Sequence, residues 1–113
     1  MAIELTLPSS PLQREILESP IVQGANETKQ YYIDFVTWGA SDAAPVTTPD
    51  VTVYDQDDVD VTTTVCSAGG SVVSDTLVYF ILTALVAGNE YKVLVEGVYS
   101  SQTYETYFTV EGE

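Results

Sequence analysis

Apolar and polar residues alternate along most of this chain, and a period of two residues is typical of β-strands with one buried face. The alternation covers residues 31–38, 51–54, 59–65, 90–96 and 103–111, and residues 76–83 form a further strand-like segment. Gly, Pro and Asp residues separate these segments at intervals of about 8–12 residues, and no long amphipathic helix interrupts them. The pattern predicts an all-β fold, a sandwich of about seven antiparallel strands.

The turns between these segments carry their own signals. Residues 51–54 and 59–65 flank an Asp-rich stretch at 55–58 and predict a β-hairpin, because Asp tolerates the left-handed turn conformation. Residues 67–75 contain a Gly-Gly pair and predict a second turn. Gly97 lies inside a strand pattern and predicts a β-bulge.

Residues 1–29 differ from the rest, and we interpret them as an extended N-terminal arm that precedes a sandwich domain at residues 30–113. Three prolines interrupt any regular element here, namely Pro8, Pro11 and Pro20. Such an arm either pairs along a sheet edge or reaches a neighbouring subunit. The sequence leaves both alternatives open.

Residues 76–83 are apolar on both strand faces, although a sheet of a small sandwich has only one dry face. The second face is therefore predicted to meet the arm, a neighbouring subunit or another protein. The candidate interface residues are the apolar side chains of the arm and of this second face: Ile3, Leu5, Leu7, Leu12, Ile16, Leu17, Leu77, Tyr79 and Ile81.

The net charge of the chain limits the classes of partner that it is expected to bind. The 113 residues include 3 basic and 17 acidic ones, which gives a formal net charge of -14. Nucleic acids and anionic membranes repel such a chain, so neither is an expected partner. The acidity fits a solvated surface, or attraction to a basic partner or to cations. We also expect no signal peptide and no membrane span.

Catalytic chemistry has little support in the sequence. The chain has no His, which removes the usual base of nucleophilic catalysis and the commonest transition-metal ligand. Cys66 is the single cysteine, so an intrachain disulfide is impossible, and no neighbouring base marks it as a nucleophile. We therefore expect a protein that is not an enzyme and that uses no cofactor.

Two groups of residues remain as candidate ligand sites. The acidic turn of Asp55, Asp57, Asp58 and Asp60 offers the oxygen ligands that Ca²⁺ prefers, but its spacing differs from that of a helix-loop-helix calcium loop, and a solvated turn is the favoured interpretation. Exposed aromatic residues stack on sugars, but most aromatics here are expected to serve the core. The aromatic candidates are Tyr31, Tyr32, Trp38, Tyr99, Tyr104 and Tyr107.

Residues 85–91 read Leu-Val-Ala-Gly-Asn-Glu-Tyr and predict a tyrosine corner, in which a Tyr hydroxyl bonds backbone a few residues upstream. The structural residues of this corner are Leu85, Gly88 and Tyr91. The stretch resembles the Leu-x-Pro-Gly-x-x-Tyr corner of fibronectin type III and related immunoglobulin-like domains, with Ala87 in the place of Pro. The resemblance implies an immunoglobulin-like β-sandwich.

A broader resemblance covers residues 30–111. The layout of residues 51–55, 60–62, the corner and 107–110 is similar to that of short immunoglobulin-like proteins in the virions of tailed bacteriophages. This implies a capsid decoration or cement protein, present in many copies or as a homo-oligomer, which binds the major capsid protein or other virion proteins. Its expected location is the virion, assembled in the host cytoplasm. The alternative is an extracellular adhesion or carbohydrate-binding module.

Overall fold

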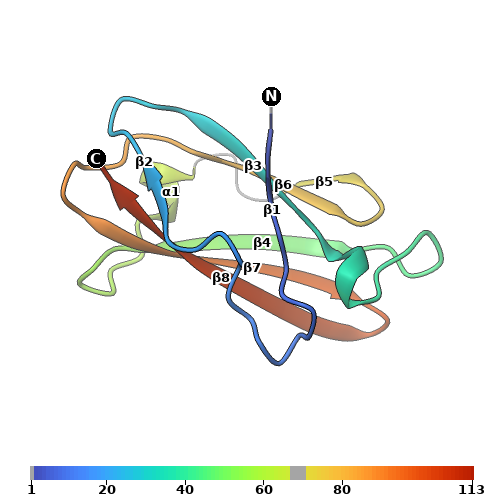
Figure 1. Ribbon diagram of the computed structural model, residues 1–113. Helices are drawn as coiled ribbons and strands as arrows, with labels where there is room; N and C mark the ends of the chain where they lie inside the picture. Colours follow the sequence, from blue (N-terminus) through green and yellow to red (C-terminus); the bar gives the residue numbers. More distant parts are fainter. Residues whose placement is uncertain (1, 67–70) are drawn as a thin grey trace.

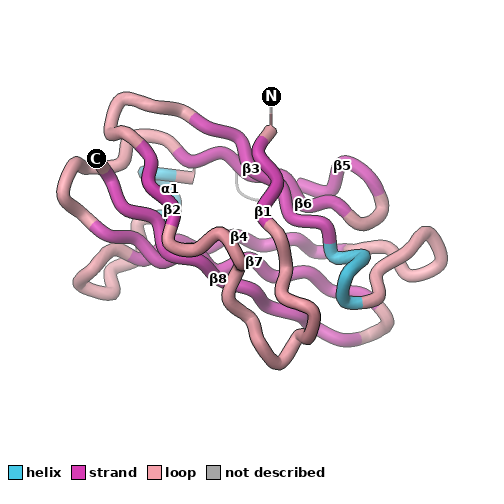
Figure 2. The backbone as a smooth tube through the Cα atoms, viewed as in Figure 1, coloured by secondary structure: helices cyan, strands magenta, loops and turns pink. Residues whose placement is uncertain are grey.

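The computed structural model describes residues 2–66 and 71–113, which form two four-stranded sheets packed face to face (Figures 1 and 2). Sheet A has the order β1 (Ile3–Leu5), β3 (Lys29–Asp34), β6 (Leu77–Leu82) and β5 (Ser71–Ser74). Sheet B has the order β2 (Ile21–Gln23), β8 (Gln102–Gly112), β7 (Glu90–Tyr99) and β4 (Thr47–Tyr54). The prediction of an all-β sandwich is confirmed.

Both sheets are mixed, so the prediction of a purely antiparallel fold is wrong. β1 runs parallel to β3, and β2 runs parallel to β8, whereas the other neighbours are antiparallel. The parallel strands both belong to the N-terminal segment, which follows the edge of sheet A and then crosses to the edge of sheet B (Figure 1). Of the two alternatives for residues 1–29, the described residues show pairing along sheet edges.

The core lies between the sheets and is built from the inward positions of β3, β6, β7 and β8. Tyr31 and Phe80 have ring centroids 5.8 Å apart, and Phe80 and Phe108 are 5.9 Å apart, so aromatic rings from both sheets meet at its centre. In β7, Tyr91, Val93 and Val95 are buried as the alternation predicts. The burial of these apolar side chains drives the two sheets together.

Two predicted strand segments are short helices in the structure. Residues 35–38 form a 3-10 helix (η1, Phe35–Trp38), because the Asp34 carboxylate accepts a hydrogen bond from the Val36 amide at 3.0 Å and Gly39 ends the turn with φ 108°. The predicted return strand at 59–65 makes only one bridge to β4 before the chain turns into α1 (Thr62–Val65).

Three other local predictions concern the turn at 67–75, the bulge at Gly97 and the outer face of β6. Residues 71–74 form β5, and residues 67–70 lie outside the described part of the chain. The β7–β8 register is continuous past Gly97, but the β4–β7 register shifts between Thr47 and Asp50, whose partners Val98 and Glu96 flank Gly97, so the irregularity lies opposite this glycine. A Cβ atom at Gly97 would lie 2.9 Å from Val46, so close packing also favours the glycine. Leu77, Tyr79 and Ile81 are half-buried rather than fully buried. No helix among residues 2–66 and 71–113 is long and apolar enough to span a bilayer.

Candidate interaction surface

The loop between β1 and β2, residues 6–20, projects beyond sheet B (Figure 1). Hydrogen bonds hold the base of this loop. Ile16 is fully buried, and its amide donates to the Tyr107 carbonyl at 2.9 Å. The Tyr107 amide donates to the Arg14 carbonyl at 3.1 Å, and the Thr106 hydroxyl donates to the same carbonyl at 2.6 Å. These bonds extend sheet B beyond β8 and fix the second half of the loop.

The two ends of the β1–β2 loop are also tied to each other. The Glu18 carboxylate accepts hydrogen bonds from the amide and the hydroxyl of Thr6, both at 2.7 Å. The Leu17 amide donates to the Thr6 carbonyl at 3.0 Å, and the Trp38 indole donates to the Pro8 carbonyl at 2.8 Å. The loop therefore has a defined conformation without a partner, which lowers the entropy cost of binding one.

Between these attachments the loop presents apolar side chains to solvent. Leu12 is 91% exposed and Leu17 is 64% exposed. Beside them lies a groove of about 400 Å³, lined by Pro8, Leu12, Gln13, Arg14, Glu15, Leu17 and Tyr107. A leucine that is almost fully exposed contributes nothing to the sandwich core, so its apolar surface is available to a partner.

The structure divides the predicted interface residues into three groups. Leu5, Leu7 and Ile16 are buried in the chain's own core, so they are not available to a partner. Ile3, Leu12 and Leu17 are exposed. Leu77, Tyr79 and Ile81 are half-buried on the outer face of sheet A, where Tyr79 stacks on Tyr32 with ring centroids 5.2 Å apart.

The outer face of sheet B carries a row of three carboxylates across three neighbouring strands. Asp50 of β4 pairs in register with Glu96 of β7, and Glu96 pairs with Glu105 of β8. We call these three residues the carboxylate row. Arg14 forms an ion pair with Glu105 at one end of the row, with its Nη1 atom 3.1 Å from Glu105 Oε1. Burial, followed by the nearby charges of Glu105 and Asp50, raises the pKa of the Glu96 carboxyl.

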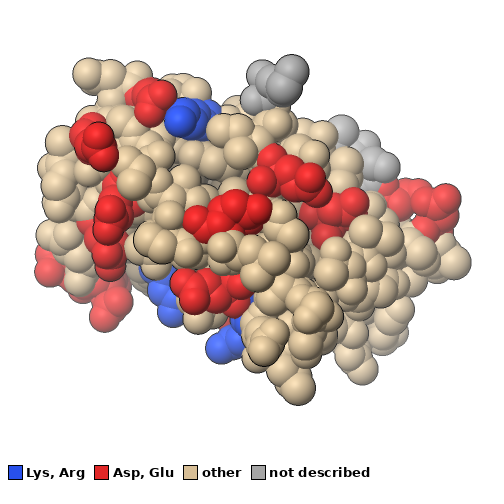
Figure 3. All heavy atoms as spheres, in the orientation of Figure 1, with Lys and Arg blue, Asp and Glu red and all other residues tan. Residues whose placement is uncertain are grey.

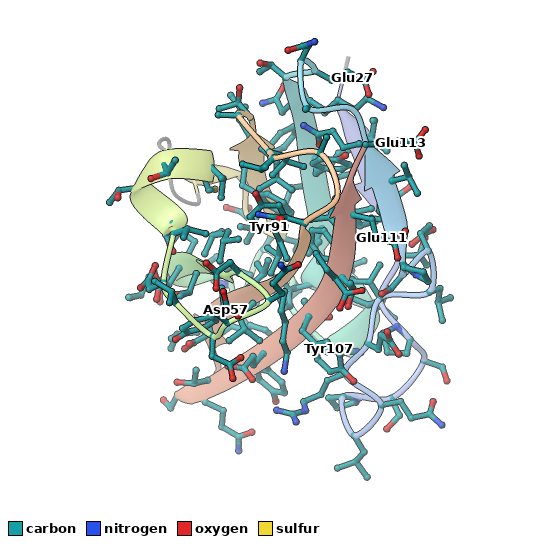
Figure 4. The ribbon with its side chains drawn as sticks, turned by 90° about the vertical axis from the view of Figure 1, so that its left-hand side faces the viewer. Glu27, Asp57, Tyr91, Tyr107, Glu111 and Glu113 are labelled. Carbon is teal, nitrogen blue, oxygen red and sulfur yellow. The ribbon has the colours of Figure 1, made fainter. Side chains whose placement is uncertain are left out.

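An apolar strip, formed by Leu94 of β7 and Tyr107 of β8, lies beside the carboxylate row. These residues are register partners two positions along the strands from Glu96 and Glu105, and both are half-buried. Tyr107 projects from β8 next to the β1–β2 loop (Figure 4). On its other side, Lys92 Nζ lies 4.9 Å from the centroid of the Tyr107 ring. The strip therefore connects the carboxylate row with the exposed leucines of the loop.

The acidic turn uses its carboxylates to hold backbone groups. Asp55 Oδ1 accepts hydrogen bonds from the amides of Asp57 and Val59 at 2.9 and 3.0 Å. Asp60 Oδ1 accepts hydrogen bonds from the hydroxyl and the amide of Thr62 at 2.6 and 3.0 Å, which lower the pKa of Asp60. Asp57 and Asp58 are exposed at the tip. In the described part of the chain, no group of three or more His, Cys, Asp or Glu residues is placed to hold a metal ion.

The aromatic candidates for sugar binding do not form one exposed platform. Tyr31, Trp38 and Tyr99 are buried, and the Tyr99 ring stacks on Tyr104 with centroids 4.3 Å apart. Of the more exposed rings, Tyr32 lies on β3 of sheet A, whereas Tyr107 lies on β8 of sheet B. Cys66 is buried at the end of α1.

The tyrosine corner has its expected geometry at the start of β7. The Tyr91 hydroxyl accepts a hydrogen bond from the Val86 amide at 2.9 Å, and Tyr91 and Leu85 are buried. Gly88 has φ 87°, a left-handed conformation that favours glycine. The corner fixes how the chain passes from sheet A to sheet B.

Two parts of this surface were not foreseen from the sequence. Glu18 was not singled out, although its bonds to Thr6 close the β1–β2 loop. The carboxylate row was also missed, because Asp50, Glu96 and Glu105 become neighbours only through the register of β4, β7 and β8. The outward parity of Glu96 and Glu105 was the one available signal.

Acidic side chains are spread over the face of the molecule seen in Figure 3, with few basic ones between them. Comparisons with known proteins add no assignment: no protein-family model matches the chain, and no curated protein matches it either. The interpretation of the surface therefore depends on its own chemistry.

Proposed function

We propose that the chain is an immunoglobulin-like module that acts by binding other proteins, as a virion structural protein that decorates or cements a capsid head. The strand orders support the immunoglobulin-like assignment. Such domains carry strands A, B, E and D in one sheet and C, F and G in the other. If β1 and β2 are the two halves of strand A, β3 to β8 take the places of B to G in both sheets. The tyrosine corner then lies at the start of strand F, its usual position.

The observation that carries the binding role is the exposure of Leu12 at the tip of a loop with a defined conformation. Exposed apolar side chains on a firmly held loop are typical of protein-interaction surfaces. The net charge of -14 disfavours nucleic acid and anionic membranes as partners, and the aromatic candidates for sugar binding do not form one exposed platform, so proteins are the expected partner class.

The test is cosedimentation with assembled capsids of the virus that encodes the chain, before and after shell expansion. Wild-type protein is expected to sediment with the shell. The variant Leu12→Ser/Leu17→Ser is expected to bind at least tenfold more weakly, because burying a leucine contributes about 1.5–3 kcal/mol and tenfold corresponds to about 1.4 kcal/mol.

The matched control is Val36→Ser/Val59→Ser, which removes two apolar side chains that are 53% and 54% exposed outside the loop. This control is expected to bind like the wild type. A wild-type protein that stays monomeric and binds no capsid would overturn the virion role. Equal binding by both double variants would show that the loop is not the contact.

A further inference from the structure

We infer that the outer face of sheet B is a docking surface for a protein partner that presents Lys or Arg side chains next to apolar ones. The apolar side chains of the partner would pack on Leu94 and Tyr107, and its cations would lie over the carboxylate row. This inference rests on the proposed binding function and adds the face that binds and the chemistry of the partner.

The carboxylate row is the first reason for a basic partner. Register partners on neighbouring strands have Cβ atoms about 4.5–5.5 Å apart, and like charges directly opposite each other are destabilising. Arg14 pairs with Glu105, at one end of the row. Within the described residues, no Lys or Arg forms an ion pair with Asp50 or Glu96. The row therefore holds negative charge that a cation from outside would neutralise.

The apolar strip is the second reason, because it makes the surface amphipathic rather than simply acidic. Leu94 and Tyr107 lie between the carboxylate row and Lys92, and Tyr107 continues into the groove formed with Leu12 and Leu17. A partner that covers both parts gains apolar burial from the strip and charge complementarity from the row. Complementary charges also speed the encounter of the two proteins.

The same features disfavour a second copy of this chain as the occupant. Two copies that met through this face by a two-fold axis would bring their carboxylate rows toward each other, and each copy carries a net charge of -14. The chain has only three basic residues, and two of them, Arg14 and Lys92, already interact with Glu105 and Tyr107. The cations must therefore come from a different protein.

The experiment uses two short synthetic peptides and amide chemical shifts of the isotope-labelled protein. In the first peptide Lys alternates with Val, and in the second Glu replaces Lys. The Lys peptide is expected to shift amides of β4, β7 and β8 around the carboxylate row and the apolar strip, and the Glu peptide is expected to shift none. Shifts that cluster on another face, or that spread evenly over the acidic surface, would overturn the inference.

Two charge-matched variants test the position of the charge. Asp50→Asn/Glu96→Gln/Glu105→Gln removes the row, and Asp57→Asn/Asp58→Asn/Glu113→Gln removes three exposed carboxylates elsewhere. The row variant is expected to bind the Lys peptide at least tenfold more weakly than the control variant, since each factor of ten is about 1.4 kcal/mol. Equal affinities of the two variants would show that only total charge matters and would overturn the inference. Leu94→Thr is expected to weaken binding as well.

Two further readouts separate the possible failures. Thermal melting checks that the row variant is folded, and its midpoint is expected to equal or exceed that of the wild type, because the repulsion removed along the row offsets the loss of the exposed Arg14–Glu105 ion pair. If capsid cosedimentation fails while the Lys peptide maps to sheet B, the virion role is lost and the docking surface stands. If the Lys peptide fails while Leu12→Ser/Leu17→Ser loses capsid binding, only the sheet B inference is lost.

Discussion

At the residue scale, two buried polar side chains join parts of the chain that strand pairing alone does not connect. Gln23 is fully buried on β2 of sheet B, and its amide nitrogen donates to the Leu82 carbonyl of sheet A at 2.9 Å and to the Glu27 carbonyl at 3.0 Å. The Tyr31 hydroxyl donates to the Gln23 carbonyl oxygen at 2.8 Å. Because the polar atoms of its side chain are all hydrogen-bonded, these bonds compensate for the desolvation of Gln23 and link the two sheets.

The Tyr91 hydroxyl makes a similar link at the corner, and Tyr91→Phe tests its contribution. The substitution leaves the Val86 amide without its acceptor, so we expect a loss of about 1–2 kcal/mol in the free energy of unfolding, measured by urea denaturation. Tyr107→Phe is the matched control, because the half-buried Tyr107 hydroxyl makes no hydrogen bond within the described residues. Equal losses in the two variants would show that the corner bond contributes nothing of its own.

At the element scale, the β7–β8 hairpin dominates sheet B, since its register is unbroken from Glu90–Glu111 to Tyr99–Gln102. The turn that closes it consists of Ser100 and Ser101, with φ values of 51° and 60°. Two successive left-handed residues are typical of a type I′ turn, which matches the twist of the strands and strongly favours Asn-Gly. Serine adopts this conformation at a cost.

Replacing the two serines by Asn-Gly is therefore expected to stabilise the protein. Ser100→Asn/Ser101→Gly is expected to raise the free energy of unfolding by about 0.5–1 kcal/mol, because the relief of backbone strain exceeds the entropy that glycine adds to the unfolded chain. Ser101→Val places a β-branched side chain at positive φ and is expected to lower the free energy of unfolding. Urea denaturation of the three proteins gives the ranking. An Asn-Gly variant less stable than the wild type would contradict the argument.

The elements that the sequence predicted well are those whose pattern is local. The alternation in β7 and β8 reflects burial on one face, so it is visible without knowledge of the partner strands. Prediction failed at 35–38 and 59–65, where Asp34 and Asp60 accept hydrogen bonds from following amides and turn an apparent strand into a helical turn. The parallel pairing of β1 with β3 and of β2 with β8 could not be predicted in this way, because it joins strands that are remote in sequence.

The candidate surface shows the same difference between features with a local sequence pattern and features that depend on remote strands. Leu12 and Leu17 were predicted as interface residues because they are apolar side chains of the N-terminal arm, and both are exposed. Ile16 fits the same description, yet it is buried, because its amide pairs with β8 and turns the side chain inward. The carboxylate row requires the register of three strands, which no local pattern contains.

At the scale of the whole molecule, titration of buried groups links the core to solution conditions. Burial raises the pKa of Tyr31 to about 12, with a smaller contribution from the charge of Glu27. Burial also raises the pKa of Tyr99 to about 12, with a smaller contribution from Tyr104. Both side chains are nearly inaccessible to solvent, with exposures of 1% and 3%. The folded state therefore holds these protons more tightly than the unfolded chain does.

The sign of the resulting pH dependence follows from linkage. Unfolded tyrosines have a pKa of about 10, so the stability from these protonated hydroxyls is fully present below pH 10 and is lost as the pH rises toward 12. We expect urea denaturation to show a loss on the order of 1–3 kcal/mol from each Tyr across that interval, because one pKa unit corresponds to about 1.4 kcal/mol.

The variant Tyr31→Phe tests whether Tyr31 causes part of this loss of stability at high pH. It is expected to be less stable than the wild type at pH 8, because Gln23 loses a donor, but to lose less stability between pH 8 and 12. A wild-type stability that stays constant up to pH 12, or an unchanged slope in Tyr31→Phe, would mean that the hydroxyl of Tyr31 reaches water in the folded protein and would contradict its place at the centre of the core.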